Sequence, residues 1–205
     1  MFQLIRIIDY GMGNLRSVQK AVEFLGFQAD ISSNIDEIKN STGIILPGVG
    51  AFPDAMKEIK EKGFDVLLKE MVYEKKIPLL GICLGMQLLF DESDEVQLTE
   101  GLGFIKGRVK KLEVDLKIPH MGWNNLKFNG KSPILEGVKE DSYVYFVHSF
   151  YADMANIEDL KASAEYGVTV PAVVAHENVY GTQFHPEKSG EAGMKMLKNF
   201  LEMVK

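Results

Sequence analysis

The sequence PLLGICLG, residues 78–85, indicates both how this chain folds and where its chemistry lies. Residues 78–82 predict a buried strand, Cys83 follows at once, and residues 84–90 have the apolar spacing of a helix. Gly81 and Gly85 stand two residues to either side of Cys83, so neighbouring chain can approach the turn without a Cβ clash. Glycine, any residue, nucleophile, any residue, glycine is the pattern of a nucleophile on a sharp strand-to-helix turn.

This placement would give Cys83 a specific chemistry. The backbone N–H groups at the start of the helix favour a thiolate and can hold an oxyanion, with the N–H of Leu84 as the nearest donor. The competing interpretation is a small buried apolar residue, which is the usual role of a lone cysteine. The two glycines after an apolar strand favour the nucleophile.

Strands and helices alternate on both sides of this turn. We expect a parallel sheet with helices on both faces, because short apolar strands alternate with amphipathic helices. A glycine, Gly26, follows the first helix as its C-terminal cap. The expected strands are residues 4–8, 27–31, 43–46 and 78–82, and the expected helices are residues 15–25, 53–60 and 64–75.

From about residue 103 the pattern changes to short strand-like pieces separated by Asn, Gly and Pro. We expect residues 108–114, 123–128 and 143–147 to form an antiparallel extension of the same sheet. Strands at residues 172–175 and 179–183 and a helix over residues 191–204 close the chain. The sequence contains no linker, repeat or low-complexity stretch, so residues 1–205 are predicted to form one domain.

Composition excludes several classes of protein. The chain has 205 residues, 46% of them hydrophobic and 25% charged, and a net charge of −6 without a clustered basic patch, which argues against a nucleic-acid surface. A single cysteine allows no internal disulfide. The apolar start, residues 1–9, is too short for a membrane span and lacks the features of a signal peptide, so we expect a cytoplasmic protein.

A thiolate that attacks an acyl group needs a base, and the base needs a group that orients it. His185 lies just past a predicted strand, and Glu187 projects on the same side two residues later. A zinc site fails, because the chain lacks the further cysteines that a deaminase would supply, and the other histidines have no ligand spacing. The alternative for His185 is a structural histidine.

Two motifs together, GICLGMQ at residues 81–87 and HPE at residues 185–187, resemble the class I glutamine amidotransferases. Three further segments are similar to the glutaminase subunits of imidazole glycerol phosphate synthases. They are DYGMGNL at residues 9–15, PGVG at residues 47–50 and PHMGWN at residues 119–124. The resemblance implies a flavodoxin-like three-layer α/β sandwich, with a mostly parallel central sheet and an antiparallel extension.

The resemblance also implies roles for individual residues. Cys83, His185 and Glu187 would form the triad, and the N–H groups of Leu84 and of Val49 in the oxyanion strand, residues 47–50, would hold the oxyanion. Glutamine would lie against Gly50, Gln87, Glu95, Ser149 and Phe150. The contact at Phe150 would be mainly through its backbone, and Glu95 would face the α-ammonium group. No cofactor and no metal are implied.

The implied partner is a (β/α)8-barrel cyclase that forms a heterodimer with this chain, closes over the site and uses the ammonia for histidine biosynthesis. The residues expected to face it are Gly11, Met12, Asn14, His120, Met121, Trp123, Asn124 and Lys188. An exposed Trp123 would suit an interface anchor, and the alternative for this residue is core packing.

Four other interpretations compete with this one. A dinucleotide site at Gly11 and Gly13 fails, because Arg16 stands where a third glycine is needed. A stand-alone cysteine hydrolase would explain the triad but not the two segments without a catalytic role. An inactive regulatory subunit does not fit an intact triad. A paralogous glutaminase that supplies ammonia for amidination of surface sugars would keep every motif, and the sequence leaves it open.

Overall fold

The computed structural model describes residues 4–204, and an eight-stranded sheet forms its centre. The strand order is β2-β1-β3-β4-β14-β13-β12-β9. The first five strands in this order are parallel, and β13, β12 and β9 extend the sheet antiparallel. Its strands are β1 (Ile5–Ile8), β2 (Ala29–Ser32), β3 (Gly43–Gly48), β4 (Leu79–Cys83), β9 (Lys127–Phe128), β12 (Leu160–Glu165), β13 (Thr169–His176) and β14 (Val179–Thr182).

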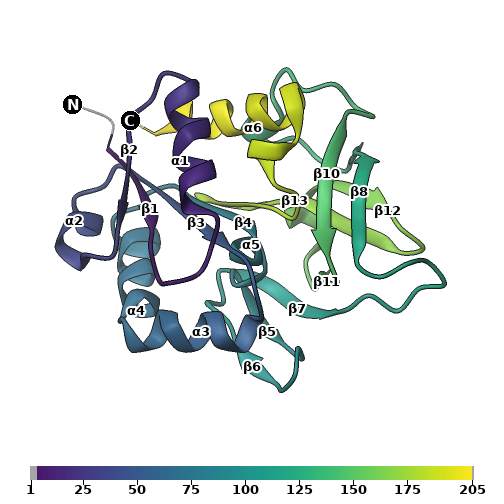
Figure 1. The fold of residues 1–205 in the computed structure, drawn as a ribbon, viewed down its shortest axis with the longest axis horizontal. Helices are drawn as coiled ribbons and strands as arrows, with labels where there is room; N and C mark the ends of the chain where they lie inside the picture. The colour runs from purple at the N-terminus through teal and green to yellow at the C-terminus, as the bar shows by residue number, and fades with distance from the viewer. Residues whose placement is uncertain (1–3, 205) are drawn as a thin grey trace.

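Helices cover both faces of this sheet (Figure 1). α1 (Leu15–Phe24) and α6 (Gly190–Met203) pack on one face, while α3 (Phe52–Glu61), α4 (Phe64–Lys69) and the π-helical turn η1 (Glu70–Glu74) pack on the other. The short α2 (Ile35–Lys39) follows β2. Helices on both faces explain why β3 and β4 are buried along their whole length and read as continuous apolar runs.

Two small sheets flank the central one. β8 (His120–Asn125) pairs antiparallel with β10 (Tyr143–His148), and β5 (Phe90–Ser93), β6 (Thr99–Glu100), β7 (Ile105–Lys111) and β11 (Phe150–Met154) form a four-stranded sheet in the order β11-β7-β5-β6. The expectation that residues 103–147 extend the central sheet is therefore wrong for most of that segment. Of that segment only β9 joins it, and the antiparallel extension is made mainly by β12 and β13.

The helix after Cys83 is much shorter than the sequence predicts. α5 (Leu84–Gln87) is a single turn, and the chain enters β5 at Phe90. The carbonyl of Leu89 accepts hydrogen bonds from the N–H groups of Phe104 and Ile105, at 2.8 and 3.0 Å. Pairing with a distant segment thus replaces the helical bonds that the apolar spacing indicated.

The other elements that were predicted lie near their predicted positions, with ends that differ by one to three residues. Four strands, β5, β6, β11 and β12, and the short helix α2 were not expected from the sequence. The other short helices are the 3-10 turns η2 (Pro133–Leu135), η3 (Ile157–Asp159) and η4 (Pro186–Lys188). Within residues 4–204, no helix is long and apolar enough to cross a membrane.

Candidate active site

Cys83 lies at a strained turn between β4 and α5. Its backbone has φ 56° and ψ −112°, outside the regions that residues with a side chain ordinarily adopt. A Cβ added at Gly85 would lie 1.8 Å from the carbonyl oxygen of Leu46, and one added at Gly81 would lie 2.6 Å from the carbonyl oxygen of Gly85. The turn expected from the glycine spacing is present, and the chain approaches too closely at both flanks for a larger residue.

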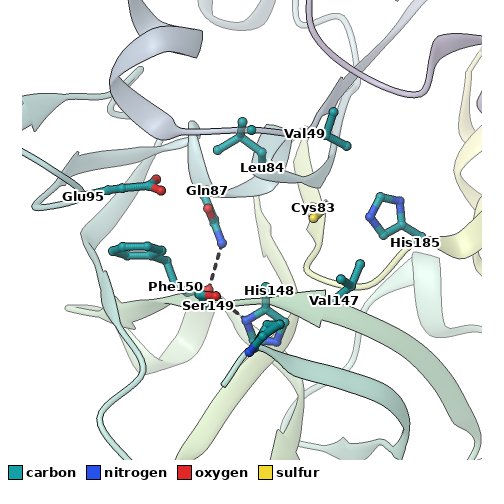
Figure 2. A pocket seen from close by; sticks show the side chains of 12 residues that line it. Val49, Cys83, Leu84, Gln87, Glu95, Val147, His148, Ser149, Phe150 and His185 are labelled. Carbon is teal, nitrogen blue, oxygen red and sulfur yellow. Dashed lines mark hydrogen bonds between the residues drawn. The ribbon is translucent and has the colours of Figure 1, made fainter. Parts of the chain in front are cut away.

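His185 and Glu187 follow β14, which is the parallel neighbour of β4. His185 Nδ1 donates a hydrogen bond to Glu187 Oε1 at 3.0 Å, which leaves Nε2 for the thiol, and Figure 2 shows the ring turned toward Cys83. Burial disfavours the imidazolium, but the interactions with Cys83 and then Glu187 outweigh burial and raise the pKa of His185 to about 9. His185 can therefore carry a proton at neutral pH for a leaving group.

Gln183 contacts the nucleophile as well, and the sequence interpretation did not single it out. Its Nε2 donates to Cys83 Sγ at 4.0 Å, and its Oε1 accepts a hydrogen bond from Gln87 Nε2 at 3.0 Å. Gln183 is fully buried. The only signal was its position two residues before His185 on the same strand end, which places both side chains at the same edge of the sheet.

The segment expected to form the oxyanion strand leaves β3 beside Cys83, with Gly48 paired to Cys83 in the β3–β4 ladder. Ile44 N–H donates to the Pro78 carbonyl at the start of this ladder. Along a strand, every second residue directs its N–H and its carbonyl toward the same neighbouring strand, so Gly48, four residues after Ile44, also faces β4. Its carbonyl therefore points toward the start of α5, and the N–H of Val49, on the other side of the same peptide, points away from it. The second oxyanion donor therefore does not face the thiol in this conformation.

A cavity of about 400 Å³ opens in front of Cys83. Figure 2 shows Cys83 and His185 at one end of it, and Gln87, Glu95 and Phe150 toward the other. The residues that line it are Val49, Gly50, Cys83, Leu84, Gln87, Glu95, Pro119, Val147, His148, Ser149, Phe150 and His185. Every residue predicted for the oxyanion or for glutamine lies on this wall, together with Pro119, Val147 and His148, which were not predicted. Glu187 stands behind His185.

The polar side chains at the end of the cavity away from Cys83 form hydrogen bonds with the protein backbone. Gln87 Nε2 donates to the Phe150 carbonyl at 2.9 Å. Glu95 Oε2 accepts the N–H of Phe52, the first residue of α3, at 2.8 Å. Burial raises the pKa of Glu95, with this hydrogen bond opposing the shift and the Asp54 carboxylate adding to it. A cationic ligand group near Glu95 would remove that penalty.

The residues expected to face a partner are not equally accessible. Gly11 and Lys188 are exposed, Met121 and Trp123 are 61% and 56% exposed, and the remaining residues of the set other than His120 are half-buried. Trp123 is thus not a core residue. His120 is 2% exposed, so its side chain lies beneath this surface and cannot meet a partner directly, contrary to the sequence-based expectation.

Two further observations bear on the chemistry of the site. Within residues 4–204, no group of three or more His, Cys, Asp or Glu side chains is arranged to hold a metal ion. The nucleophile, and the histidine that can serve as acid and base, come from the carboxyl ends of β4 and β14. This arrangement suits acyl transfer through a thioester, with donors for an oxyanion at the start of α5.

Comparisons with known proteins agree with this geometry. The family model for class-I glutamine amidotransferases matches residues 6–204. The imidazole glycerol phosphate synthase subunit HisH of Bacillus cereus (strain ATCC 10987 / NRS 248) is 54% identical over 201 residues, which cover 98% of this chain and 95% of that protein. The same subunit of Bacillus anthracis (strain CDC 684 / NRRL 3495) is 53% identical over the same shares. A solved glutamine amidotransferase structure superposes with a TM-score of 0.78 at 20% identity, over 97% of this chain and 98% of that chain.

Proposed function

This chain belongs to the class I glutamine amidotransferase family, and we propose that it is the glutaminase subunit of an imidazole glycerol phosphate synthase. It hydrolyses glutamine to glutamate and ammonia and passes the ammonia to a partner subunit for histidine biosynthesis in the cytoplasm. The observation that carries the proposal is that Cys83 and His185 line one cavity at the ends of adjacent parallel strands, with Glu187 hydrogen-bonded to His185 from behind.

The reaction uses these residues in sequence. The Cys83 thiolate attacks the side-chain amide carbon of glutamine, and the resulting oxyanion is held by the N–H of Leu84 and, after rearrangement, of Val49. The C–N bond breaks as His185 gives its proton to the departing ammonia, which leaves a glutamyl thioester. His185, now neutral, takes a proton from water, and the hydroxide attacks the thioester to release glutamate and the thiolate. Glu187 keeps the imidazole oriented throughout.

The cavity fits glutamine by size and by charge. At about 400 Å³ it lies within the range of small-ligand sites. Glu95, whose ionisation burial disfavours, is placed to pair with the α-ammonium group. The Ser149–Phe150 backbone runs along the opposite wall and would orient the α-carbon end, while the amide reaches Cys83.

We propose a (β/α)8-barrel cyclase as the partner, docked over the cavity mouth. Met121 and Trp123 are exposed on β8, and in the β8–β10 register they alternate with buried or half-buried residues and pair with Val147 and Tyr145. Val147 lines the cavity, so this apolar face begins at the mouth of the site. Exposed aromatic and methionine side chains beside a site suit an interface, and Lys188 adds a cation next to the triad.

The conformation of the oxyanion strand implies that the isolated chain is a weak glutaminase. The Gly48 carbonyl faces the start of α5, where the oxyanion needs N–H donors, so the peptide after Gly48 must turn over before efficient catalysis. Gly50 has φ 108° and lies next to the moving peptide, where glycine allows the change at low cost. Docking of the partner would favour the reoriented state.

One experiment tests this function. The purified chain is assayed for glutamine hydrolysis alone, with the cyclase, and with the cyclase bound to its own ligand, and transfer is followed by cyclase turnover on glutamine compared with added ammonia. We expect slow hydrolysis alone, strong stimulation by the ligand-bound cyclase, and glutamine-dependent turnover. Full activity without a partner, or no association with the cyclase, would overturn the proposal. Turnover with a sugar-amidating partner instead would assign the chain to the paralogous group.

A further inference from the structure

The two-stranded β8–β10 ribbon carries polar side chains among the apolar residues of its inner face, opposite its exposed apolar face. His120 pairs with His148 and Asn124 pairs with Val144, and these residues point away from Met121 and Trp123. His120 and His148 are 2% and 6% exposed. The ribbon therefore carries two buried histidines between a surface that can meet a partner and the wall of the glutamine cavity.

A continuous series of hydrogen bonds runs along this inner face. Asn124 Nδ2 lies 3.3 Å from His120 Nε2, His120 Nδ1 lies 3.0 Å from His148 Nε2, and His148 Nδ1 lies 2.9 Å from the Phe150 carbonyl. Figure 2 shows His148 beneath the cavity, next to the Ser149–Phe150 segment. At the outer end Asn124 Nδ2 also donates to the Glu165 carbonyl at 2.9 Å, and Asn124 Oδ1 accepts the N–H of Asn125.

Only one set of tautomers satisfies all these contacts. The Phe150 carbonyl can only accept, so His148 Nδ1 carries the proton and His148 Nε2 accepts. His120 Nδ1 must then donate, and His120 Nε2 accepts from Asn124. Burial lowers the pKa of His120 to about 4 and of His148 to about 3, so both rings are neutral near pH 7. His120 is also stacked between Phe146 and Tyr166, with ring centroids 4.6 and 3.9 Å away.

At the cavity the series continues to the nucleophile. The Phe150 carbonyl accepts from both His148 Nδ1 and Gln87 Nε2, so both of its lone pairs are used by the protein. The same Gln87 amide group donates to Gln183, whose Nε2 in turn donates to Cys83 Sγ. The peptide that forms one wall of the cavity is thus fixed from the partner-facing ribbon on one side and from the reactive thiol on the other.

From this arrangement we infer that Asn124, His120 and His148 are positioning residues through which docking at β8 sets the glutamine-binding wall at Ser149–Phe150. The inference rests on the proposed function, because it needs a partner at β8. A ribbon held by the partner keeps the series in one geometry, and the wall then binds glutamine in the reactive pose. The three residues act through the Phe150 peptide and need not touch substrate.

Two substitutions at His148 separate its two contacts. The amide of asparagine places a donor where Nδ1 stands, so His148→Asn keeps the bond to Phe150 and breaks the link to His120. The longer glutamine places an acceptor where Nε2 stands, so His148→Gln keeps the link and breaks the bond to Phe150. Tyr166→Phe is the control for a change beside His120 that leaves the series intact, because it keeps the ring that stacks on His120 and removes the hydroxyl, which donates to the Lys117 carbonyl.

The test measures kcat and KM for glutamine of each variant, alone and with the ligand-bound cyclase. We expect His148→Gln to raise KM about tenfold in both states, in line with one lost hydrogen bond at a buried group. His148→Asn should raise KM of the isolated chain less than His148→Gln does, because it keeps the bond to Phe150, but it should reduce stimulation by the cyclase at least about fivefold, the low end of typical coupling. Tyr166→Phe should leave both quantities unchanged.

The inference would be overturned if the cyclase stimulated His148→Asn as much as the wild type. It would also be overturned if Tyr166→Phe lost as much stimulation as His148→Asn. Either result would leave the proposed function intact. Absence of stimulation in the wild type would instead contradict the proposed function. A second test avoids variants that fail to fold. In 15N spectra of the wild-type complex, both rings should be neutral with the proton on Nδ1 near pH 7, and a proton on Nε2 of His148 would overturn the proposed series.

Discussion

Replacing Gly85 with alanine should disable the site although none of the three triad residues is changed. The added Cβ would lie 1.8 Å from the carbonyl oxygen of Leu46, whereas ordinary contacts begin at 3.4 Å, so α5 and β3 must separate by the difference, about 1.6 Å. The backbone of Gly85 has no positive φ, so the clash is the only cost. Forcing an extra methyl group into a packed site typically costs about 1–3 kcal/mol.

The displacement acts directly on catalysis, because α5 begins with Leu84, whose N–H is the proposed oxyanion donor. A misplacement of about 1 Å costs about 100-fold in rate, so kcat of the complex should fall by about that factor or more. The unfolding midpoint should drop by about 4–8 °C for a loss of about 2 kcal/mol. Glutaminase assays of the complex and thermal unfolding of the isolated chain measure both effects.

Gly190→Ala is the matched control. Gly190 has φ 57°, and no atom lies within 4 Å of the position of an added Cβ, so alanine there meets backbone strain of about 1–2 kcal/mol but no clash. It lies at the start of α6, outside the wall of the cavity. We expect kcat within about twofold of the wild type. If Gly85→Ala also keeps kcat within about threefold, the close approach of β3 to α5 does not position the oxyanion donor.

Three other changes have defined outcomes. Tyr10→Phe should raise the free energy of unfolding by about 1 kcal/mol, because the buried Tyr10 hydroxyl beside Gly48 has no hydrogen-bond partner among the described residues. Chemical denaturation measures this change, and a lower free energy of unfolding would contradict it. Activity that depends on protonated His185 should fall above about pH 9. Glu187→Gln should move this fall to lower pH in a pH–rate profile, because Glu187 helps to raise the pKa of His185. An unchanged profile would show that Glu187 does not raise this pKa. Lys188→Ala should weaken binding of the cyclase more than it changes KM for glutamine, and unchanged affinity in titration calorimetry would count against the proposed surface.

The effect of pH on stability follows from the same shift. The pKa of His185 in the folded chain is about 9, above its usual value of 6.5. Its interactions therefore stabilise the fold fully below about pH 6.5, and this contribution is lost as the pH rises through about 9.

The parallel half of the sheet could be predicted from the sequence because its strands are buried on both faces and read as uninterrupted apolar runs. The turn at Cys83 was equally predictable, because glycine two residues to either side of a cysteine is needed where the chain turns sharply against its neighbours. The helix after it was overestimated, since Leu88 and Leu89 satisfy a helical spacing but their carbonyls accept hydrogen bonds from residues 102–105. Local patterns carry no information about such pairing.

Contacts between site residues that lie in one motif could be predicted from the sequence. Contacts that depend on how two strands pair could not. His185 and Glu187 are two residues apart, so their contact follows from the extended chain. The contact of His120 with His148 depends on the antiparallel register of β8 and β10, and nothing in either strand alone indicates it. Gln183 was missed for a similar reason, because its partners come from α5 and β4.

Hydrolysis of glutamine through a thioester on Cys83 is the step on which every other proposed role in this site depends. The most direct test quenches the complex of the chain with ligand-bound cyclase during turnover and examines the peptide that contains Cys83 by mass spectrometry, in the wild type and in Cys83→Ala. We predict a glutamyl adduct on Cys83 in the wild type, and no adduct and no glutamate formation in Cys83→Ala, which should still bind the cyclase with wild-type affinity. Normal glutamate formation by Cys83→Ala would show that glutamine is not hydrolysed through Cys83.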